Sequence, residues 1–131
     1  MLKELDHVAI AVPDTEAALR VWRDVVGLKV LYREVVNEGT VRLTHLDMGS
    51  TQLQLVEPLT ADHPLHAWLD QRGPGLHHIC FKVDDVAQAR EQASAQGLEP
   101  AAAIHQGTQG RRAMFFDPAS TDGEPVEITG Q

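Results

Sequence analysis

The sequence predicts an α+β fold in which two tandem βαβββ modules form a curled mixed sheet around a central cleft. The first observation is a repeat, because Leu5–Asp14 and Leu76–Asp85 both read as a strand that carries a histidine and ends at a helix-starting aspartate. His7 and His78 occupy the same place in the two copies. The second observation is that the order of predicted elements repeats as well. We therefore predict one domain over 1–131, with module one at about 1–58, a connection at about 59–75 and module two at about 76–131.

Composition excludes several functional classes. The chain has 131 residues, 43% of them hydrophobic, which is enough apolar surface for one core. Its formal charge of −8 disfavours a nucleic-acid surface, which needs a basic patch. No apolar run is long enough to span a membrane, and no secretory signal is visible. The single cysteine cannot form an internal disulfide, so we expect a cytoplasmic protein.

The first module reads as strand, helix and three further strands. An alternating run begins it, and Pro13 with Asp14 suits the first turn of a helix. Gly27 suits the end of that helix. Turn signals rich in Asn, Asp and Gly separate the β-rich runs that follow. The predicted elements are a strand at 4–12, a helix at 14–27, and strands at 29–36, 41–46 and 51–56.

The connection and the second module follow the same logic. His63–Leu69 is typical of a short helix, and Arg72–Gly75 of a sharp loop. The second module then repeats the order of the first. Its predicted elements are a strand at 76–83, a helix at 84–97, and strands at 99–104, 111–116 and 125–129.

Side-chain alternation along these strands predicts a cluster of polar residues on the face away from the helices. On the strand at 76–83, His77 should face the helix layer and His78 the opposite side. Gln54 and Glu127 lie between apolar neighbours on the last strand of each module. The cluster comprises His7, Gln54, His78 and Glu127. Two imidazoles, an amide oxygen and a carboxylate suit a divalent cation such as Co²⁺, Mn²⁺, Ni²⁺ or Zn²⁺.

Each of these residues also has a purely structural interpretation. A lone histidine at the start of a strand is more often hydrogen-bonded within the fold than a metal ligand. Gln54 alone would be a surface amide, and Glu127 alone a solvated charge. The symmetric register favours the metal site. We interpret Cys80 as a small core residue. The other histidines are interpreted as structural or solvated: His45, His63, His66, His77 and His105.

Several motifs resemble the vicinal oxygen chelate superfamily, which includes glyoxalase I, and within it the methylmalonyl-CoA epimerase family. The most specific motif is Arg72–Ile79, which reads Arg-Gly-Pro-Gly-Leu-His-His-Ile. The resemblance covers nearly the whole chain. The other motifs are Leu5–Asp14, Gln52–Leu59, Val83–Asp85, Gly110–Arg112, Asp117–Thr121 and Val126–Ile128.

The resemblance implies an epimerase that interconverts (R)- and (S)-methylmalonyl-CoA through a metal-stabilised enolate. It also implies that Glu127 is both a metal ligand and one of two bases. Arg111 and Arg112, beside a Gly-rich loop, are candidates to bind the coenzyme A phosphates, although a solvated hairpin is the alternative. An acyl-CoA substrate and a homodimer are expected.

One position departs from the family pattern. Where some relatives have a glutamate as the second base, the nearest match here is Arg42, which is a poor base and could instead bind a carboxylate. Glu38 and His45 are nearby alternatives. Other functions remain open: a glyoxalase I-type lyase, a ring-cleaving dioxygenase, or a non-catalytic small-molecule binder of the same fold.

Overall fold

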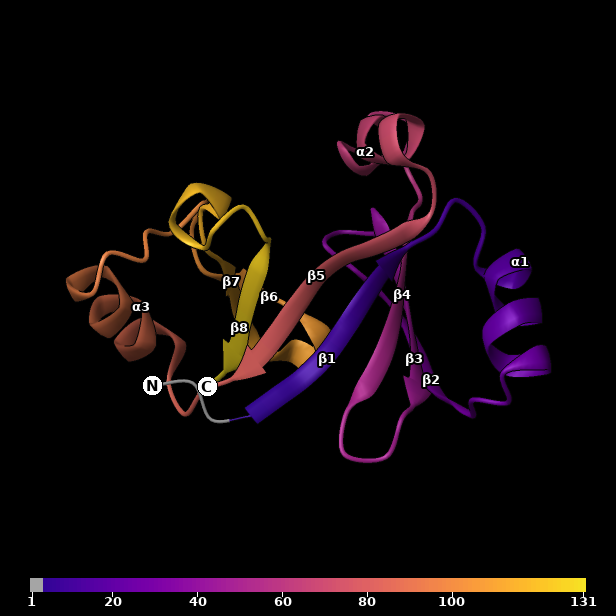
Figure 1. Cartoon of the computed structure of the whole chain (residues 1–131), viewed down its shortest axis with the longest axis horizontal. Coiled ribbons are helices and arrows are strands. Elements are labelled where there is room, and N and C mark those ends of the chain that lie inside the picture. Colours follow the sequence, from indigo (N-terminus) through magenta and orange to yellow (C-terminus); the bar gives the residue numbers. More distant parts are fainter. Residues whose placement is uncertain (1–3) are drawn as a thin grey trace. The chain divides into compact units, whose positions relative to one another are not determined.

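The computed structural model describes residues 4–131, which fall into two compact units. The first unit is Val8–His77, and the second is His78–Gln131 together with the N-terminal segment up to His7. The division falls inside two strands, β1 (Glu4–Ala11) and β5 (Gly75–Lys82), rather than in the connection. In each unit a helix lies beside the strands (Figure 1).

In the first unit, the strands are hydrogen-bonded in the order β2-β3-β4-β1. The strands β2–β3 and β3–β4 are antiparallel. The Asp14 side chain caps the helix by accepting from the amides of Glu16 and Ala17, as expected of an aspartate N-cap. The elements are α1 (Thr15–Leu19), η1 (Arg20–Val25), β2 (Val30–Val36), β3 (Val41–Asp47), β4 (Gln52–Pro58) and α2 (Leu65–Arg72).

The second unit repeats this pattern, with strands in the order β5-β8-β7-β6. The strands β5 and β8 are parallel, whereas β8–β7 and β7–β6 are antiparallel. Asp85 caps α3 by accepting from the Gln88 amide. The elements are α3 (Val86–Ala95), β6 (His105–Gln106), η2 (Thr108–Gly110), β7 (Arg112–Phe115), η3 (Pro118–Ser120) and β8 (Val126–Gly130).

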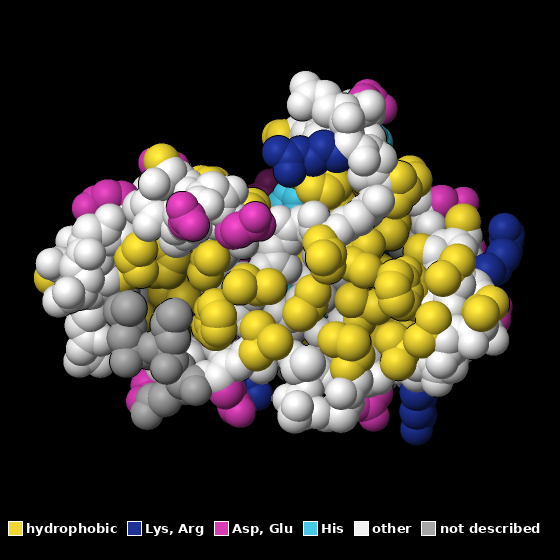
Figure 2. Space-filling model, viewed as in Figure 1, with side chains coloured by type: hydrophobic (Ala, Val, Ile, Leu, Met, Phe, Trp, Pro, Cys, Tyr) yellow, Lys and Arg dark blue, Asp and Glu magenta, His cyan; other side chains and the backbone are white. Residues whose placement is uncertain are grey.

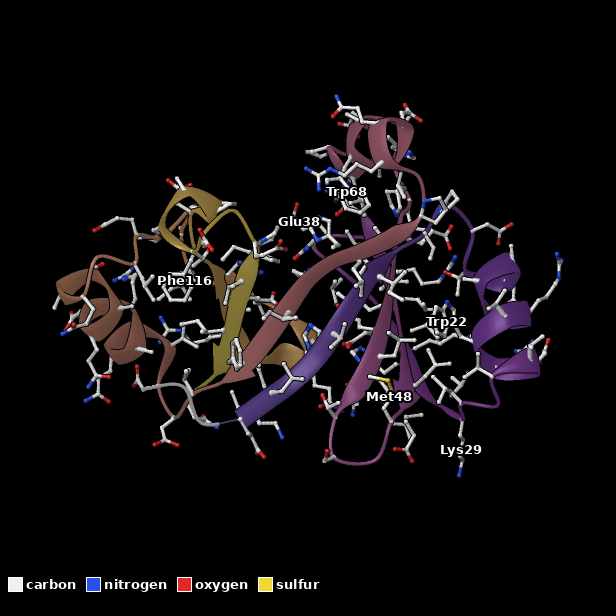
Figure 3. All side chains as sticks on the ribbon, in the orientation of Figure 1. Trp22, Lys29, Glu38, Met48, Trp68 and Phe116 are labelled. Carbon is white, nitrogen blue, oxygen red and sulfur yellow. The ribbon has the colours of Figure 1, made fainter. Side chains whose placement is uncertain are left out.

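Each unit has an apolar core between its helix and its strands. In the first unit Leu19 and Leu55 are fully buried, and Trp22 points from the helix toward the strands (Figure 3). In the second unit Val86 of α3 packs with Phe116 and Ile128. Full burial of one such side chain contributes about 1.5–3 kcal/mol, so these contacts hold the helices on one face of the strands. The opposite face is left for polar groups.

The predicted α+β class and the repeated βαβββ order are confirmed, but three elements differ. The strand expected at 99–104 is wrong, because β6 covers only His105–Gln106. Pro100 lacks an N–H and forms only an isolated bridge with Phe116, and the three alanines after it have low β-propensity. The first helix changes at Arg20 to a π-helix, in which the Val26 amide donates to the Val21 carbonyl. The connecting helix extends three residues further than predicted, to Arg72.

Within residues 4–131, no helix combines the length and the apolar character that a membrane crossing requires.

Candidate metal centre

Three potential metal-ligand atoms lie close together in the second unit. The Nε2 atoms of His7 and His78 are 3.3 Å apart. The Oε1 atom of Glu127 lies 3.3 Å from His7 Nε2 and 3.4 Å from His78 Nε2. The three atoms therefore form a nearly equilateral triangle. All three residues are buried, with 1%, 9% and 9% of their surfaces exposed.

The strands of the second unit determine this arrangement. Strand β8 lies between β5 and β7, and its register places Glu127 beside Cys80 on one side and Phe115 on the other. The Phe115 ring contacts the His78 ring edge-on, with centroids 4.9 Å apart. Because Val126 and Ile128 pack toward α3, Glu127 must project from the opposite face, where the histidines are.

The electrostatics keep the carboxylate ionised. Burial alone would raise the pKa of Glu127, but hydrogen bonds and charge from His7 and His78 hold it well below its usual range. Burial alone would also lower the pKa of His7, yet its hydrogen bonds to Asp6 and Glu127 raise it. A proton and a cation therefore compete for His7, as is usual at sites whose ligands must be deprotonated.

The donor set fits a divalent cation. Ligand atoms about 2.0–2.2 Å from one ion lie roughly 3.0–3.5 Å from one another, and these three atoms are 3.3–3.4 Å apart. Two imidazole nitrogens and a carboxylate oxygen suit Co²⁺, Mn²⁺, Ni²⁺, Zn²⁺ or Fe²⁺. Three protein ligands on one side of an ion also leave room for other oxygen donors.

A second group of possible ligands, Asp6, His7 and Cys80, overlaps the first. Cys80 is fully buried, which confirms its predicted place in the interior. Burial, together with the negative charge of Glu127, raises the pKa of the Cys80 thiol well above its ordinary value. A thiol that stays protonated is a poor metal ligand, so the histidine and glutamate group is the better candidate.

Gln54 belongs to the first unit, where it is buried on β4 with 4% of its surface exposed. Leu53 and Leu55 pack toward the helix, so Gln54 projects from the other face, as predicted. Its partner across the β3–β4 pair is His45. Ligation of a metal by Gln54 stays a prediction.

His45 is a buried residue with several polar contacts. Its Nε2 atom lies 3.0 Å from Glu34 and its Nδ1 atom 3.1 Å from Gln52. The Tyr32 ring stacks on it at 4.1 Å. These contacts agree with a structural role, although the register puts His45 on the face of β3 that corresponds to Gln54.

Arg42 projects from the opposite face of β3. Its Nη1 atom lies 3.4 Å from Glu57, which also accepts hydrogen bonds from Thr15 at the start of α1. The guanidinium is thus engaged on the helix-covered side of the strands, and not on the side of Gln54. Glu38, which with His45 is an alternative candidate for the second base, is exposed in the turn after β2.

The two arginines predicted to bind phosphate lie in different surroundings. Arg112, the first residue of β7, is exposed. Arg111 donates to Asp6, with 3.1 Å between Nη1 and Oδ1 and 3.5 Å between Nη2 and Oδ2. Asp6 in turn lies 2.7 Å from His7 Nδ1. Phosphate binding by either arginine stays a prediction.

Asp6 and Phe115 are neighbours of the centre that pattern reasoning missed. Adjacent residues on an ideal strand face opposite sides, so alternation does not predict that Asp6 contacts His7. In the sequence, the signal for this contact is that Asp6 directly precedes the candidate ligand His7. His77, by contrast, contacts Trp68 of α2 at 5.0 Å between ring centroids, which separates it from His78.

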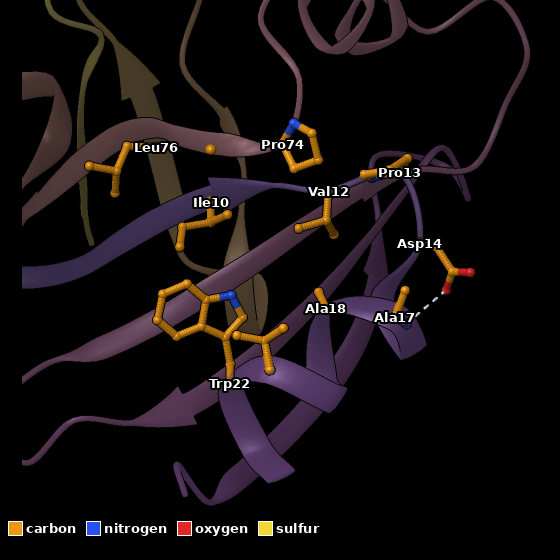
Figure 4. A pocket seen from close by; sticks show the side chains of 11 residues that line it. Ile10, Val12, Pro13, Asp14, Ala17, Ala18, Trp22, Pro74 and Leu76 are labelled. Carbon is orange, nitrogen blue, oxygen red and sulfur yellow. Dashed lines mark hydrogen bonds between the residues drawn. The ribbon is translucent and has the colours of Figure 1, made fainter. Parts of the chain in front are cut away.

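An apolar hollow of about 540 Å³ lies in the first unit, between α1 with η1 and the start of β5. Figure 2 shows hydrophobic side chains gathered over this region. Trp22 lies below Ile10, across the hollow from Pro74 and Leu76 (Figure 4). Asp14 is the one acidic residue in its lining, and the Asp14 carboxylate accepts hydrogen bonds from backbone amides at the start of α1. The hollow therefore lacks the convergent polar groups that the metal centre has.

Residues 6–115 match the model of the Glyoxalase/Bleomycin resistance protein/Dioxygenase superfamily. The chain belongs to this superfamily. Its superfamily relatives include the uncharacterized protein YqjC of Bacillus subtilis, 36% identical over 97% of this chain and 91% of that protein. The mitochondrial methylmalonyl-CoA epimerase of Mus musculus is 33% identical over 97% of this chain and 72% of the relative.

A solved superfamily structure is similar over the whole chain. It is the methylmalonyl-CoA epimerase of Streptomyces coelicolor in complex with 2-nitronate-propionyl-CoA. The TM-score is 0.90 at 30% identity, and the match covers 100% of this chain and 99% of that one. The vicinal oxygen chelate fold predicted from the motifs is thereby confirmed.

Proposed function

We propose that this protein is a metal-dependent epimerase that interconverts (R)- and (S)-methylmalonyl-CoA. The observation that carries the proposal is the triangle of His7, His78 and Glu127, buried and spaced for one cation. The epimerases among its relatives support the choice of substrate. The proposed ligands are these three residues with Gln54, and the proposed ion is Co²⁺, with Mn²⁺, Ni²⁺ or Zn²⁺ as alternatives.

The reaction needs removal of the α-proton of the thioester and its return to the other face. A bound divalent ion would supply Lewis acidity, which stabilises the negative charge that develops on the substrate oxygens. Glu127 is the proposed base on one face, because an ionised carboxylate can accept a proton and the two imidazoles keep this one ionised. His7 and His78 hold that carboxylate in place through its Oε1 atom.

The second base is proposed to be Glu38 or His45. Arg42 is not suited to this role, because a guanidinium stays protonated and its partner Glu57 lies on the helix-covered face. Arg112, which is exposed, is the arginine better placed in its own unit to meet a phosphate, and Arg111 is engaged with Asp6. A homodimer and a cytoplasmic location remain predictions.

The test is conversion of one pure diastereomer of methylmalonyl-CoA by Co²⁺-loaded protein, followed by chromatographic separation of the two forms. We expect Glu127→Gln to lose about 10²- to 10⁴-fold in rate, the usual contribution of a general base. The matched control is Glu124→Gln, which neutralises an exposed glutamate three residues earlier. A Glu127→Gln protein that converts the substrate as fast as the parent would refute the proposal.

A ring-cleaving dioxygenase is the second candidate, because two histidines and one carboxylate on one side of an ion are the ligand set of non-haem Fe²⁺ oxygenases. Metal identity separates the two functions. Anaerobically purified protein that retains Fe²⁺ through dialysis and gains no activity with Co²⁺ would favour the dioxygenase. Preference for Co²⁺ with proton exchange on the thioester favours the epimerase.

A further inference from the structure

Asp6 connects the metal centre to a residue far away in the sequence. Asp6 is 8% exposed, and its carboxylate contacts His7 Nδ1 at 2.7 Å through Oδ2 and Arg111 Nη1 at 3.1 Å through Oδ1. Arg111 and Asp6 are 105 residues apart in the sequence. The contacts therefore form a chain from Arg111 through Asp6 to His7, all within the second unit.

The Arg111 guanidinium is oriented to hold the Asp6 carboxylate in one position. Its two terminal nitrogens face the two carboxylate oxygens, at 3.1 and 3.5 Å, which is the paired arrangement that makes arginine selective for carboxylates. The Nε atom of Arg111 is buried and makes no hydrogen bond within residues 4–131. The Arg111 side chain is 29% exposed, whereas the Asp6 side chain that it contacts is 7% exposed.

This contact has a consequence for the imidazole. A carboxylate at Nδ1 holds a proton on that nitrogen and so leaves the Nε2 lone pair free. His7 Nε2 is the atom that faces His78 Nε2 and Glu127 Oε1. In metal sites, partners of this kind orient the ligand ring, and their loss typically weakens metal binding by about 10- to 100-fold.

We propose that Asp6 and Arg111 are positioning residues of the metal centre: Asp6 sets the tautomer and orientation of His7, and Arg111 holds Asp6 in place. This inference rests on the proposed metal site. In this proposal Arg111 supports a metal ligand through Asp6 and does not bind the coenzyme A phosphates. It also predicts that an arginine acting on His7 through Asp6 controls metal affinity.

The first measurement is the affinity for Co²⁺, followed by visible absorbance, in Asp6→Asn, Arg111→Gln and Arg111→Lys. We expect Asp6→Asn and Arg111→Gln to bind about 10- to 100-fold more weakly than the parent, and Arg111→Lys to recover part of the loss. The control is Lys82→Gln, which removes a cation from an exposed pair with Glu4 on the same strand as Asp6. It should bind Co²⁺ as the parent does.

The second measurement needs no metal. Proton and nitrogen NMR of the metal-free protein should show a slowly exchanging proton on His7 Nδ1. Asp6→Asn should abolish or shift this signal, because an amide NH₂ can donate to Nδ1 and favour the other tautomer. If the parent binds no metal, the proposed function fails, and the NMR result still decides whether Asp6 sets the tautomer.

Two results would overturn the inference. One is an unchanged Nδ1 signal in Asp6→Asn. The other is parental Co²⁺ affinity in Arg111→Gln, with any effect confined to the KM for the acyl-CoA, since this would assign Arg111 to phosphate binding. Near-ultraviolet circular dichroism of each variant verifies its fold, and Arg111→Lys serves if Arg111→Gln does not fold.

Discussion

At the scale of single residues, a proton and a cation compete for the His7 imidazole in the metal centre. Glu127 and Asp6 both have lowered pKa values, because hydrogen bonds to His7, His78 and Arg111 outweigh the effect of burial. His7 has a raised pKa for the reciprocal reason. In the metal-free protein the raised pKa of His7 favours the protonated imidazole over a wider pH range, and a cation must compete with that proton.

This competition predicts opposite pH dependences for stability and metal affinity. The ordinary pKa of His7 is 6.5 and the folded value is higher, so its stabilisation of the metal-free protein is complete below pH 6.5. That stabilisation is lost as the pH rises through the folded pKa, because the folded state then releases the proton that it held more tightly. Co²⁺ affinity should rise over the same interval.

Urea denaturation of metal-free protein and Co²⁺ titration, both over a series of pH values, measure the two trends. His7→Asn should remove the decline in stability. A parent protein whose metal-free stability rises through this interval would contradict the assignment.

The second base can be separated from Glu127 by substituting Glu38 and His45 one at a time with glutamine. In a two-base reaction, loss of one base blocks proton transfer on one face only. We expect the variant that lacks the second base to exchange the α-proton of one diastereomer with solvent and to leave the other unchanged. Mass spectrometry of each pure diastereomer measures this difference. If both variants exchange both diastereomers at the parental rate, neither residue is the base.

At the scale of elements, the position of Glu127 depends on how β8 packs. Gly130 ends this strand, and a Cβ atom added there would collide with the carbonyl oxygen of Val83. Backbone cannot move aside as a flexible side chain can. Gly130 therefore allows the close approach of β8 to the end of β5, beside the α3 N-terminus.

Gly130→Ala is expected to lower the free energy of unfolding by about 1–3 kcal/mol, the usual range for overpacking. Gly75→Ala is the matched control, since nothing lies within 4 Å of its added Cβ and its backbone conformation is ordinary. Urea denaturation of both variants gives the comparison. Equal stability of Gly130→Ala and the parent would show that the strand can shift.

The elements also show what could be predicted from the sequence. Alternation separated His78 from His77, and the repeat identified His78 as the counterpart of His7, which is the pair found 3.3 Å apart. The prediction of a strand at 99–104 was wrong, because Pro100 and the alanines after it have low β-propensity and outweigh a weak strand pattern. The contact of Arg111 with Asp6 spans 105 residues, so no local pattern contains it.

At the scale of the whole molecule, the duplicated module explains why the proposed ligands come from distant parts of the chain. His7 and His78 are 71 residues apart, and Glu127 lies near the C-terminus. An ion that binds only the folded arrangement must stabilise it. The size of this stabilisation depends on the concentration of the ion relative to its dissociation constant.

Co²⁺ at about 100 times its dissociation constant is expected to raise the free energy of unfolding by about 2.7 kcal/mol. The measurement is urea denaturation with and without Co²⁺. His78→Ala should abolish the increase, whereas His105→Ala, outside the centre, should retain it. An equal increase in His78→Ala would mean that the ion binds elsewhere.

The most direct test of the proposed function is solvent deuterium exchange at the α-carbon of methylmalonyl-CoA. The protein is stripped of metal, and the reaction is followed in D₂O by mass spectrometry before and after addition of Co²⁺. We predict exchange with Co²⁺, little exchange without it, and little in Glu127→Gln with Co²⁺. Absence of exchange in Co²⁺-loaded parent protein, or equal exchange in the metal-free protein, would rule out the proposed metal-dependent epimerase.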